Sequence, residues 1–388
     1  MKIVHIHLLG PYTDGWGYQE NVLPEIQVRQ GHEVTVITGC RAHRPDNTVT
    51  EVEPGQYTIN GVKIVRIAQK MVFPNVSMNT VWFHYPVKTW LECLTPDIIL
   101  VHGLGQGITN LEIRQYAKKH PECVIYGDVH AFEGNASESK RFKRKIAEIF
   151  MSGCRKLLYP YYRSVLCITQ QCMDYAKTAY KVPAEKLKLF PLGYDQTSID
   201  WKHKEEIRKE FREKNRIGLD ELVIVHGGKI IPRRKTEMAV DAVCQLNCKV
   251  RLVVFGAIDD SIKEKILNKF SQCEGLIYLG HLSKQEYIKA FLASDIALFP
   301  GGQSALWEEA IGCGLPLLVN ATERKDAPYY DRGGNVIFTK EDTTQSFIDE
   351  LNEMISTGKY KQMAFVAATT GRHFFSYERI SEIMLGKE

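Results

Sequence analysis

The feature that most constrains the fold of this chain is an alternation between short apolar runs and segments with helical spacing. The first half contains the runs KIVHIHLL, EVTVIT, DIILVHG and VIYGDVH, separated by helical patterns such as the one at about residues 18–30. A strand, a helix and a second strand form the βαβ unit, which builds a parallel sheet with helices on both faces. The pattern therefore predicts an α/β fold of the doubly wound kind.

The alternation occurs twice, which predicts two domains. A charged helical segment, WKHKEEIRKEFREKNRIG, ends at Gly218, and the strand pattern then restarts with ELVIVHGG, VRLVVFG, LIYLG, DIALFP and LPLLVN. A chain of 388 residues is also too long for one ordinary core. We expect two Rossmann-like domains, residues 1–200 and 201–372, that face each other across a cleft. Residues 373–388 are expected to form an amphipathic helix that docks back on the first domain.

Composition narrows the class of protein. The 50 Lys and Arg residues against 46 Asp and Glu leave a charge of +4, too mild to indicate a nucleic-acid-binding protein. No apolar run has the roughly 18 residues that a membrane-spanning helix needs. The 10 cysteines are scattered and include no CxxC pair, which predicts reduced thiols in a cytoplasmic protein.

The second half carries a pattern suited to a diphosphate. Gly228 and Lys229 follow an apolar run, and Lys235 stands six residues further on, where a helix is expected to begin. Ammonium groups and the backbone N–H groups of a helix start stabilise a concentrated negative charge such as that of a diphosphate. Taken singly, each lysine fits an ordinary surface position better than a binding site.

In order and spacing, the segment from about residue 222 to residue 320 resembles the nucleotide-sugar domain of the retaining glycosyltransferases of family four, which have the GT-B fold. The resemblance implies that Gly228, Lys229 and Lys235 hold the donor diphosphate, with Lys229 in place of the family's Arg. It also implies that Glu309, before the run AIGCGLP, binds the ribose hydroxyls, with Glu308 as the alternative ligand.

The chain departs from the family at one position. The family's first motif glutamate, which contacts the donor sugar, falls at position 301, and this chain has Gly301 there. We expect Gln303 and Ser304, or the backbone amides of this segment, to replace that contact.

The resemblance extends more weakly over the first half. Gly15 and Gly17 match a glycine-rich loop that approaches the donor phosphates, although a tight turn explains them equally well. His130 ends the run VIYGDVH, where family members carry an active-site histidine, with Asp128 and Glu133 as partners. A structural histidine is the alternative. His102 ends the neighbouring run and is a weaker candidate of the same kind.

A basic segment lies near these residues. Five cationic residues precede the apolar side chains of IAEIFM, a combination typical of helices on anionic lipid, although a solvated helix face fits as well. The cationic residues are Lys140, Arg141, Lys143, Arg144 and Lys145.

The functional hypothesis follows from the resemblance. It is retaining transfer of a sugar from a nucleotide diphosphate donor, most simply UDP, to a glycan or lipid-linked acceptor in bacterial surface-polysaccharide assembly. We expect no cofactor and no metal, since no Asp-x-Asp motif is suitably placed. The expected location is the cytoplasm, with peripheral association at the inner face of the membrane. A GT-B nucleotide-sugar epimerase and a non-catalytic nucleotide-binding subunit are the alternatives.

Overall fold

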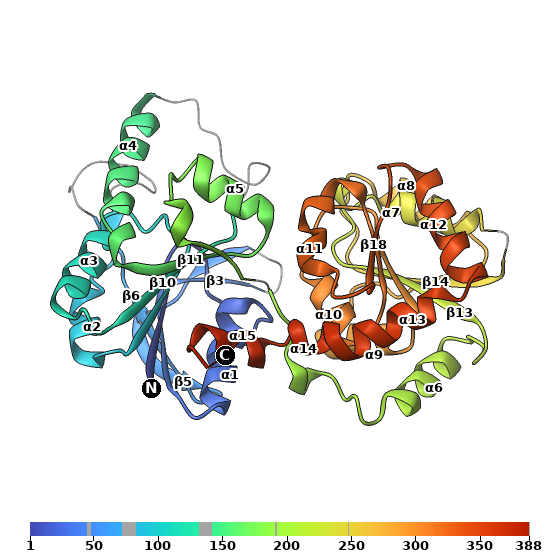
Figure 1. Ribbon diagram of the computed structural model, residues 1–388, viewed down its shortest axis with the longest axis horizontal. Helices are drawn as coiled ribbons and strands as arrows, with labels where there is room; N and C mark the ends of the chain where they lie inside the picture. Colours follow the sequence, from blue (N-terminus) through green and yellow to red (C-terminus); the bar gives the residue numbers. More distant parts are fainter. Residues whose placement is uncertain (45–47, 72–82, 132–141, 191, 247, 388) are drawn as a thin grey trace. The chain divides into compact units, whose positions relative to one another are not determined.

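The computed structural model describes residues 1–44, 48–71, 83–131, 142–190, 192–246 and 248–387. The chain divides into two compact units, Met1–Pro191 (unit 1) and Leu192–Glu388 (unit 2), each built on its own sheet (Figure 1). The prediction of two doubly wound α/β domains is confirmed. The division falls nine residues before the predicted boundary.

Unit 1 contains an eight-stranded sheet in the order β12-β11-β10-β9-β1-β2-β6-β5. All neighbouring strands are parallel except β5 and β6. The strands of this sheet are β1 Lys2–His7, β2 Glu33–Gly39, β5 Gly55–Ile59, β6 Val62–Ile67, β9 Ile98–His102, β10 Val124–Val129, β11 Tyr162–Cys167 and β12 Leu187–Leu189. Two small ribbons pair β3 Arg41–His43 with β4 Val49–Glu51, and β7 Lys70–Met71 with β8 Phe83–His84. The helices are α1 Gln19–Arg29, α2 Lys88–Leu94, α3 Thr109–Lys119, α4 Phe142–Lys156 and α5 Gln170–Thr178.

The centre of this sheet places three strand ends side by side. β1 pairs with β9 in a register that matches His7 to His102, and β9 pairs with β10. Because the three strands run parallel, their carboxyl ends lie at one edge. The polar residues that end these strands therefore meet.

The antiparallel hairpin of β5 and β6 was not predicted. Its turn consists of Asn60 and Gly61, which have φ angles of 49° and 82°. Asn-Gly is the residue pair best suited to a two-residue hairpin turn with positive φ. The signal was present in the sequence.

Unit 2 contains a six-stranded, wholly parallel sheet in the order β15-β14-β13-β16-β17-β18. Its strands are β13 Leu222–Gly227, β14 Val250–Phe255, β15 Leu276–Tyr278, β16 Ile296–Phe299, β17 Leu317–Val319 and β18 Val336–Phe338. Its helices are α6 Lys204–Lys214, α7 Thr236–Cys244, α8 Lys263–Gln272, α9 Lys284–Leu292, α10 Leu306–Gly312, α11 Ala327–Tyr330, α12 Thr344–Ser356, α13 Lys359–Val366, α14 Arg372–Phe374 and α15 Tyr377–Met384.

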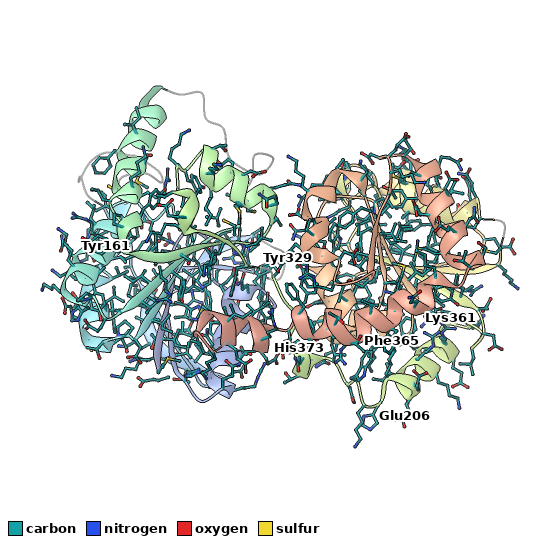
Figure 2. The ribbon with its side chains drawn as sticks, viewed as in Figure 1. Tyr161, Glu206, Tyr329, Lys361, Phe365 and His373 are labelled. Atoms are coloured by element: carbon teal, nitrogen blue, oxygen red, sulfur yellow. A yellow bond between two sulfur atoms is a disulfide. The ribbon has the colours of Figure 1, made fainter. Side chains whose placement is uncertain are left out.

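Each face of this sheet carries a separate apolar core, and Figure 2 shows side chains filling both spaces. Leu252 and Val254 of β14 pack with α7, α8 and α12, whereas Val253 and Phe255 pack with α9 and α10. Side chains of a strand point alternately to its two faces, so a strand buried on both faces is apolar throughout. This explains the continuous apolar runs of the sequence.

The last helices join the beginning of unit 2. Tyr194 is buried, forms a bridge with Ser376, and donates its hydroxyl hydrogen to the carbonyl of Arg372 at 2.9 Å. Tyr329, labelled in Figure 2, packs edge-on against Phe374 and Phe375. The segment is therefore part of unit 2, and its docking on the first domain stays a prediction.

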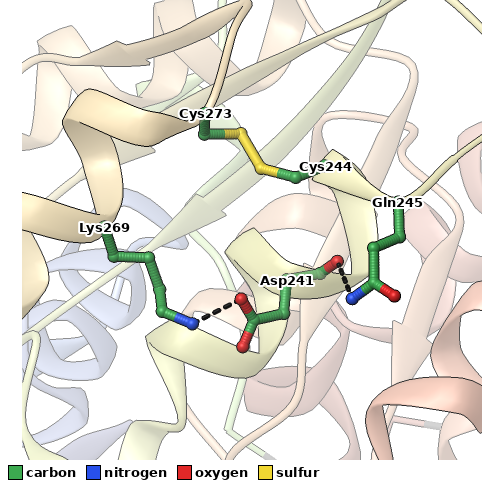
Figure 3. Close-up of a disulfide and its surroundings, with 5 residues drawn as sticks. All are labelled: Asp241, Cys244, Gln245, Lys269 and Cys273. Atoms are coloured by element: carbon green, nitrogen blue, oxygen red, sulfur yellow. Dashed lines mark hydrogen bonds and ion pairs between the residues drawn. A yellow bond between two sulfur atoms is a disulfide. The ribbon is translucent and has the colours of Figure 1, made fainter.

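The prediction that all cysteines are reduced is wrong. Cys244 at the end of α7 and Cys273 just after α8 form a disulfide, and Lys269 and Asp241 form an ion pair between the same helices (Figure 3). The two cysteines are 29 residues apart, but the fold brings their Cα atoms to 5.8 Å, within the range for a disulfide. Sequence spacing alone did not show this approach. The other eight cysteines are free thiols.

Candidate functional site

The strand ends at the centre of unit 1 form a polar cluster. Nδ1 of His102 lies 2.7 Å from Oδ2 of Asp128, and Nε2 of His130 lies 3.5 Å from the same oxygen. The backbone N–H of Gly103 donates to the other carboxylate oxygen at 2.7 Å. The structure therefore brings together His130, Asp128 and the weaker candidate His102. Glu133, the other proposed partner, lies outside the described residues.

Asp128 is a buried anion. Burial opposes its ionisation, but the charges and hydrogen bonds of His102 and His130 outweigh burial and hold the pKa of Asp128 well below its usual value. The reciprocal effect acts on His130. Burial lowers its pKa, but the charge and hydrogen bond of Asp128 dominate and raise the pKa of His130 above 6.5. A raised pKa brings the titration of this ring towards neutral pH.

A cavity of about 270 Å³ opens beside this cluster. His7 and Glu20, whose nearest side-chain atoms are 3.5 Å apart, line it together with the cluster. The remaining lining residues are Leu9, Gly103, Leu104, Val129, Ala131 and Tyr180. A concave site with apolar walls and several convergent polar groups is typical of a binding site for a small molecule or a sugar.

Gly15 and Gly17 lie in an exposed loop between β1 and α1. Trp16 between them stacks on His43, with ring centroids 4.9 Å apart. The preceding residue, Asp14, pairs with the buried Arg66 at 3.3 Å. The loop is thus anchored on both sides of Gly15.

In unit 2, the predicted phosphate-binding residues lie where β13 ends and α7 begins. Gly228 follows β13 with a φ of 107°, and its carbonyl oxygen would lie 1.8 Å from a Cβ on Gly256, so both positions need glycine. Lys229 is exposed. Lys235 occupies the N-cap of α7 with a φ of 51°. The turn therefore presents two ammonium groups and the start of a helix.

Lys235 has a counterion in unit 2. It forms an ion pair with Asp342, which also accepts a hydrogen bond from Asn320. Burial acts against the ionisation of Asp342, but the hydrogen bonds from Lys235 and Asn320 hold its pKa below the usual value. The carboxylate of Asp342 therefore balances the charge of Lys235.

Gly301 fills a position with no room for a side chain. A Cβ there would lie 2.5 Å from Cα of Arg234 and 2.7 Å from the carbonyl oxygen of Arg233. The guanidinium of Arg234 also donates to the carbonyl of Gln303 at 2.6 Å. The side-chain amide of Gln303 donates to the hydroxyl of Tyr330 at 2.5 Å, and Ser304 is half-buried. The departure from the family pattern at Gly301 therefore has a steric cause.

The two adjacent glutamates of α10 occupy different environments. Glu308 is fully buried and accepts a hydrogen bond from Tyr330 at 2.7 Å. Burial raises the pKa of Glu308 to about 7, although that hydrogen bond opposes the rise. Glu309 is 7% exposed and pairs with Lys284 at 3.1 Å. Glu309 is the ionic member of the pair, and Glu308 is part of the core.

The predicted site residues thus form two groups, one in each unit. Sequence reasoning missed several residues that support them. Some of these residues could have been found from the sequence. A polar residue inside an apolar strand, such as His5, is unusual. Others, such as Tyr330 and Asp342, gave no such signal, because they reach the site from distant parts of the chain. The missed residues are His5, His7, Glu20, Gln27, Arg66, Lys284, Tyr330 and Asp342.

The basic segment is described only in part. Lys140 and Arg141 lie outside the described residues, and Lys143, Arg144 and Lys145 fall in the first turns of α4, where only the backbone is described. Further along the helix, the side chains of Ile149 and Phe150 are 74% and 40% exposed. Among the residues that the structure describes, no helix has the length and apolar character needed to cross a membrane.

The environment of Glu308 makes stability depend on pH. Its folded-state pKa of about 7 exceeds its ordinary value of 4.5, so the folded protein keeps a proton that the unfolded chain releases, and stability falls as pH rises between these values. We predict that Glu308→Gln, which keeps the acceptor for Tyr330, is more stable than wild type at pH 8 by about 3 kcal/mol. Urea unfolding at pH 5 and pH 8 measures this difference.

The difference in unfolding free energy between Glu308→Gln and wild type should shrink strongly at pH 5. Glu353→Gln, which removes an exposed partner of Lys359, is the control and should change stability little at either pH. An equal stability difference between Glu308→Gln and wild type at both pH values would contradict the raised pKa of Glu308.

Known proteins resemble this chain in part of its sequence and in its fold. Residues 26–198 match the family model described as Glycosyltransferase Family 4. No curated protein sequence gives a significant match.

Solved structures match both units. Sucrose-phosphate synthase from Thermosynechococcus elongatus is 12% identical, with 99% of this chain and 97% of that chain covered and a TM-score of 0.66. HepE from Anabaena in complex with UDP is 13% identical, with 100% and 99% covered and a TM-score of 0.68. The lipopolysaccharide outer core galactosyltransferase WaaB is 14% identical, with 100% of both chains covered and a TM-score of 0.63. At these identities the likeness of the whole chain to solved structures concerns the fold, which is the GT-B fold, and over residues 26–198 the chain is similar to the glycosyltransferases of family 4.

Proposed function

We propose that this glycosyltransferase moves a sugar from a UDP-sugar donor to a glycan or lipid-linked acceptor with retention of anomeric configuration. The observation that carries the proposal is the turn between β13 and α7, where Gly228, Lys229 and Lys235 surround the start of a helix. Such a turn suits a diphosphate, because backbone N–H groups and ammonium groups act on the same anion. The complex of the structural neighbour HepE with UDP supports the choice of nucleotide.

Each unit has a part in this proposal. In unit 2 the diphosphate takes the place of Asp342 beside Lys235, and Glu309 binds the ribose hydroxyls. The buried Glu308 holds Tyr330 and, through it, Gln303. Gln303, Ser304 and the backbone of residues 301–304 contact the donor sugar in place of the family's glutamate.

In unit 1 the acceptor binds in the cavity beside His130, whose lining residues Leu9 and Glu20 flank the loop of Gly15 and Gly17 in the sequence. The cavity contains imidazole and carboxylate groups, which hydrogen-bond sugar hydroxyls. The structural neighbour WaaB is a lipopolysaccharide outer core galactosyltransferase. This supports the assembly of bacterial surface polysaccharide as the setting that we propose.

We further propose that no divalent metal is needed. Lys229 and Lys235 supply fixed positive charge to the departing diphosphate, which is the electrostatic role that a metal ion plays in other transferases. This part of the proposal rests on the position of the two lysines.

A second candidate function is nucleotide binding without turnover. Gly301 favours it, because the family's sugar-contacting glutamate has no room at that position. This candidate shares the nucleotide site with the main proposal but forms no glycosidic bond.

Binding of the nucleotide tests the donor site. At 100 times its dissociation constant, a ligand adds about 2.7 kcal/mol to stability, which raises the melting temperature by several degrees. We predict this shift with UDP and a smaller shift with GDP and ADP. Lys235→Ala and Glu309→Ala should each weaken UDP binding roughly tenfold or more, since each removes a charge-assisted contact.

Lys359→Ala is the control, because it removes a surface ion pair of unit 2 with Glu353. It should leave the UDP shift unchanged. The shift should also persist in EDTA. Lack of stabilisation by all three nucleotides would overturn the donor site, and a shift that disappears in EDTA would overturn metal independence.

We also propose that α4 rests on the cytoplasmic face of an anionic membrane. Ile149 and Phe150 are exposed, and five basic residues precede them in the sequence. Each basic side chain near an anionic surface contributes about 1 kcal/mol. We predict that the protein sediments with vesicles containing phosphatidylglycerol but not with pure phosphatidylcholine, and that Ile149→Glu with Phe150→Glu abolishes sedimentation.

Phe365→Glu provides the matched control. Phe365, labelled in Figure 2, is a 69% exposed phenylalanine on α13 of unit 2. This variant should sediment like wild type. Equal sedimentation of all three proteins, or no sedimentation of wild type, would contradict the proposed surface.

A further inference from the structure

A line of hydrogen-bonded side chains runs through the core of unit 1 to the cavity. Oε1 of Gln27 on α1 lies 2.7 Å from Nε2 of His5, and Nδ1 of His5 lies 3.0 Å from Nε2 of His102. His102 then contacts Asp128 at 2.7 Å through its other nitrogen. Gln27 and His5 are fully buried, and His102 and Asp128 are at most 5% exposed. The assigned activity gives no role to Gln27, His5 or His102.

Counting hydrogens restricts the states of this line. Asp128 is ionised and only accepts hydrogen bonds, so Nδ1 of His102 must carry a hydrogen. His5 is neutral, because burial, followed by the charge of His102, lowers its pKa to about 3. A neutral ring has one N–H group. The tautomer of His5 therefore determines whether His5 or His102 donates the hydrogen bond between them.

The amide of Gln27 selects between two arrangements. In the structure its oxygen faces His5, so Nε2 of His5 donates to it and Nδ1 of His5 is an acceptor. Nε2 of His102 must then donate, which makes His102 an imidazolium. If the amide nitrogen faced His5 instead, the two hydrogen bonds of His5 would reverse, and His102 would be neutral while still donating to Asp128.

Asp128 also faces a second imidazole, that of His130. A buried carboxylate is costly unless a positive charge balances it, but two imidazolium rings on one carboxylate repel each other. The other titratable groups that face His130 are His7 on β1, Glu20 on α1 and Tyr180 beyond α5. The ion pair described for the His130 ring is the one with Asp128, at 3.5 Å.

We propose that His102 and His130 share a single positive charge on Asp128, and that Gln27 and His5 are positioning residues that favour its location on His102. The charge on His102 leaves His130 neutral, so that one of its two ring nitrogens is a hydrogen-bond acceptor. The charge on His130 makes both of its nitrogens donors. The line therefore determines whether His130 presents an acceptor or only donors to a ligand in the cavity. The statement about a ligand rests on the proposed function, whereas the shared charge does not.

Titration of the His130 ring in the full chain tests the proposal without any substrate. Protein labelled with ¹³C in its histidine rings is titrated by NMR, and the His130 signal is identified by its absence in His130→Gln. Asp128→Asn should lower the pKa of His130 by about one unit or more, because the balancing anion is lost. His102→Asn, which keeps a donor to Asp128 but carries no charge, should raise it by about one unit.

Gln27→Leu extends the test to the far end of the line. An unpaired N–H group in the core is less tolerated than an unpaired acceptor, so His5 should then donate to His102 and leave it neutral. The pKa of His130 should rise, as in His102→Asn. Circular dichroism establishes that each variant is folded, and three independent variants keep the test valid if one of them does not fold.

His120→Gln is the control, since His120 pairs with Glu92 at 3.2 Å on the surface of unit 1. It should leave His130 unchanged. An unchanged pKa of His130 in all folded variants, or shifts of one common sign, would overturn the proposal. These outcomes are independent of the proposed function, because a protein that transfers no sugar would titrate in the same way.

Discussion

Parallel pairing of strands determines where polar chemistry gathers in each unit. In unit 1, β1, β9 and β10 end side by side, and the residues at or just beyond their ends are His7, His102 and His130. In unit 2, β13 and β16 are neighbours, and the chain that leaves them contains Gly228 and Gly301. The strands themselves are buried on both faces and apolar, so their carboxyl ends are where polar groups can meet a ligand.

Much of this arrangement was predictable because it depends on local pattern. Apolar runs indicated the strands and the edge of each sheet, and the resemblance to the glycosyltransferases of family four pointed to His130, Gly228 and Lys235. The hairpin turn at Asn60 and Gly61 was also visible in the sequence but was overlooked.

Other features depend on packing between distant segments. Gln27 reaches His5 only because α1 lies over β1, and Cys244 reaches Cys273 only because α7 and α8 end close together. The family match also differs from the residue-level resemblance. It covers residues 26–198, whereas the phosphate and ribose motifs lie between 222 and 320. Overall sequence similarity and the similarity of binding motifs thus concern different halves of the chain.

Gly301 illustrates why a departure from a family pattern needs structural examination. In the sequence, Gly301 replaces the glutamate that contacts the donor sugar in the family, and Gln303 and Ser304 were expected to replace that contact. In the structure, the backbone of residues 233–234 occupies the space of its side chain, and Arg234 secures the adjoining carbonyls. A side chain at position 301 would clash with this backbone, so a glutamate cannot be introduced there without a local rearrangement.

The most direct test of the central claim is the configuration of the bond that the protein forms. The protein is incubated with UDP-sugars and a panel of glycan acceptors, and ¹H NMR follows the anomeric proton. Retaining transfer predicts release of UDP and a product with the same anomeric configuration as the donor. An inverted product would contradict retention, epimerised nucleotide sugar without transfer would indicate an epimerase, and an unchanged donor in the presence of bound nucleotide would indicate a non-catalytic subunit.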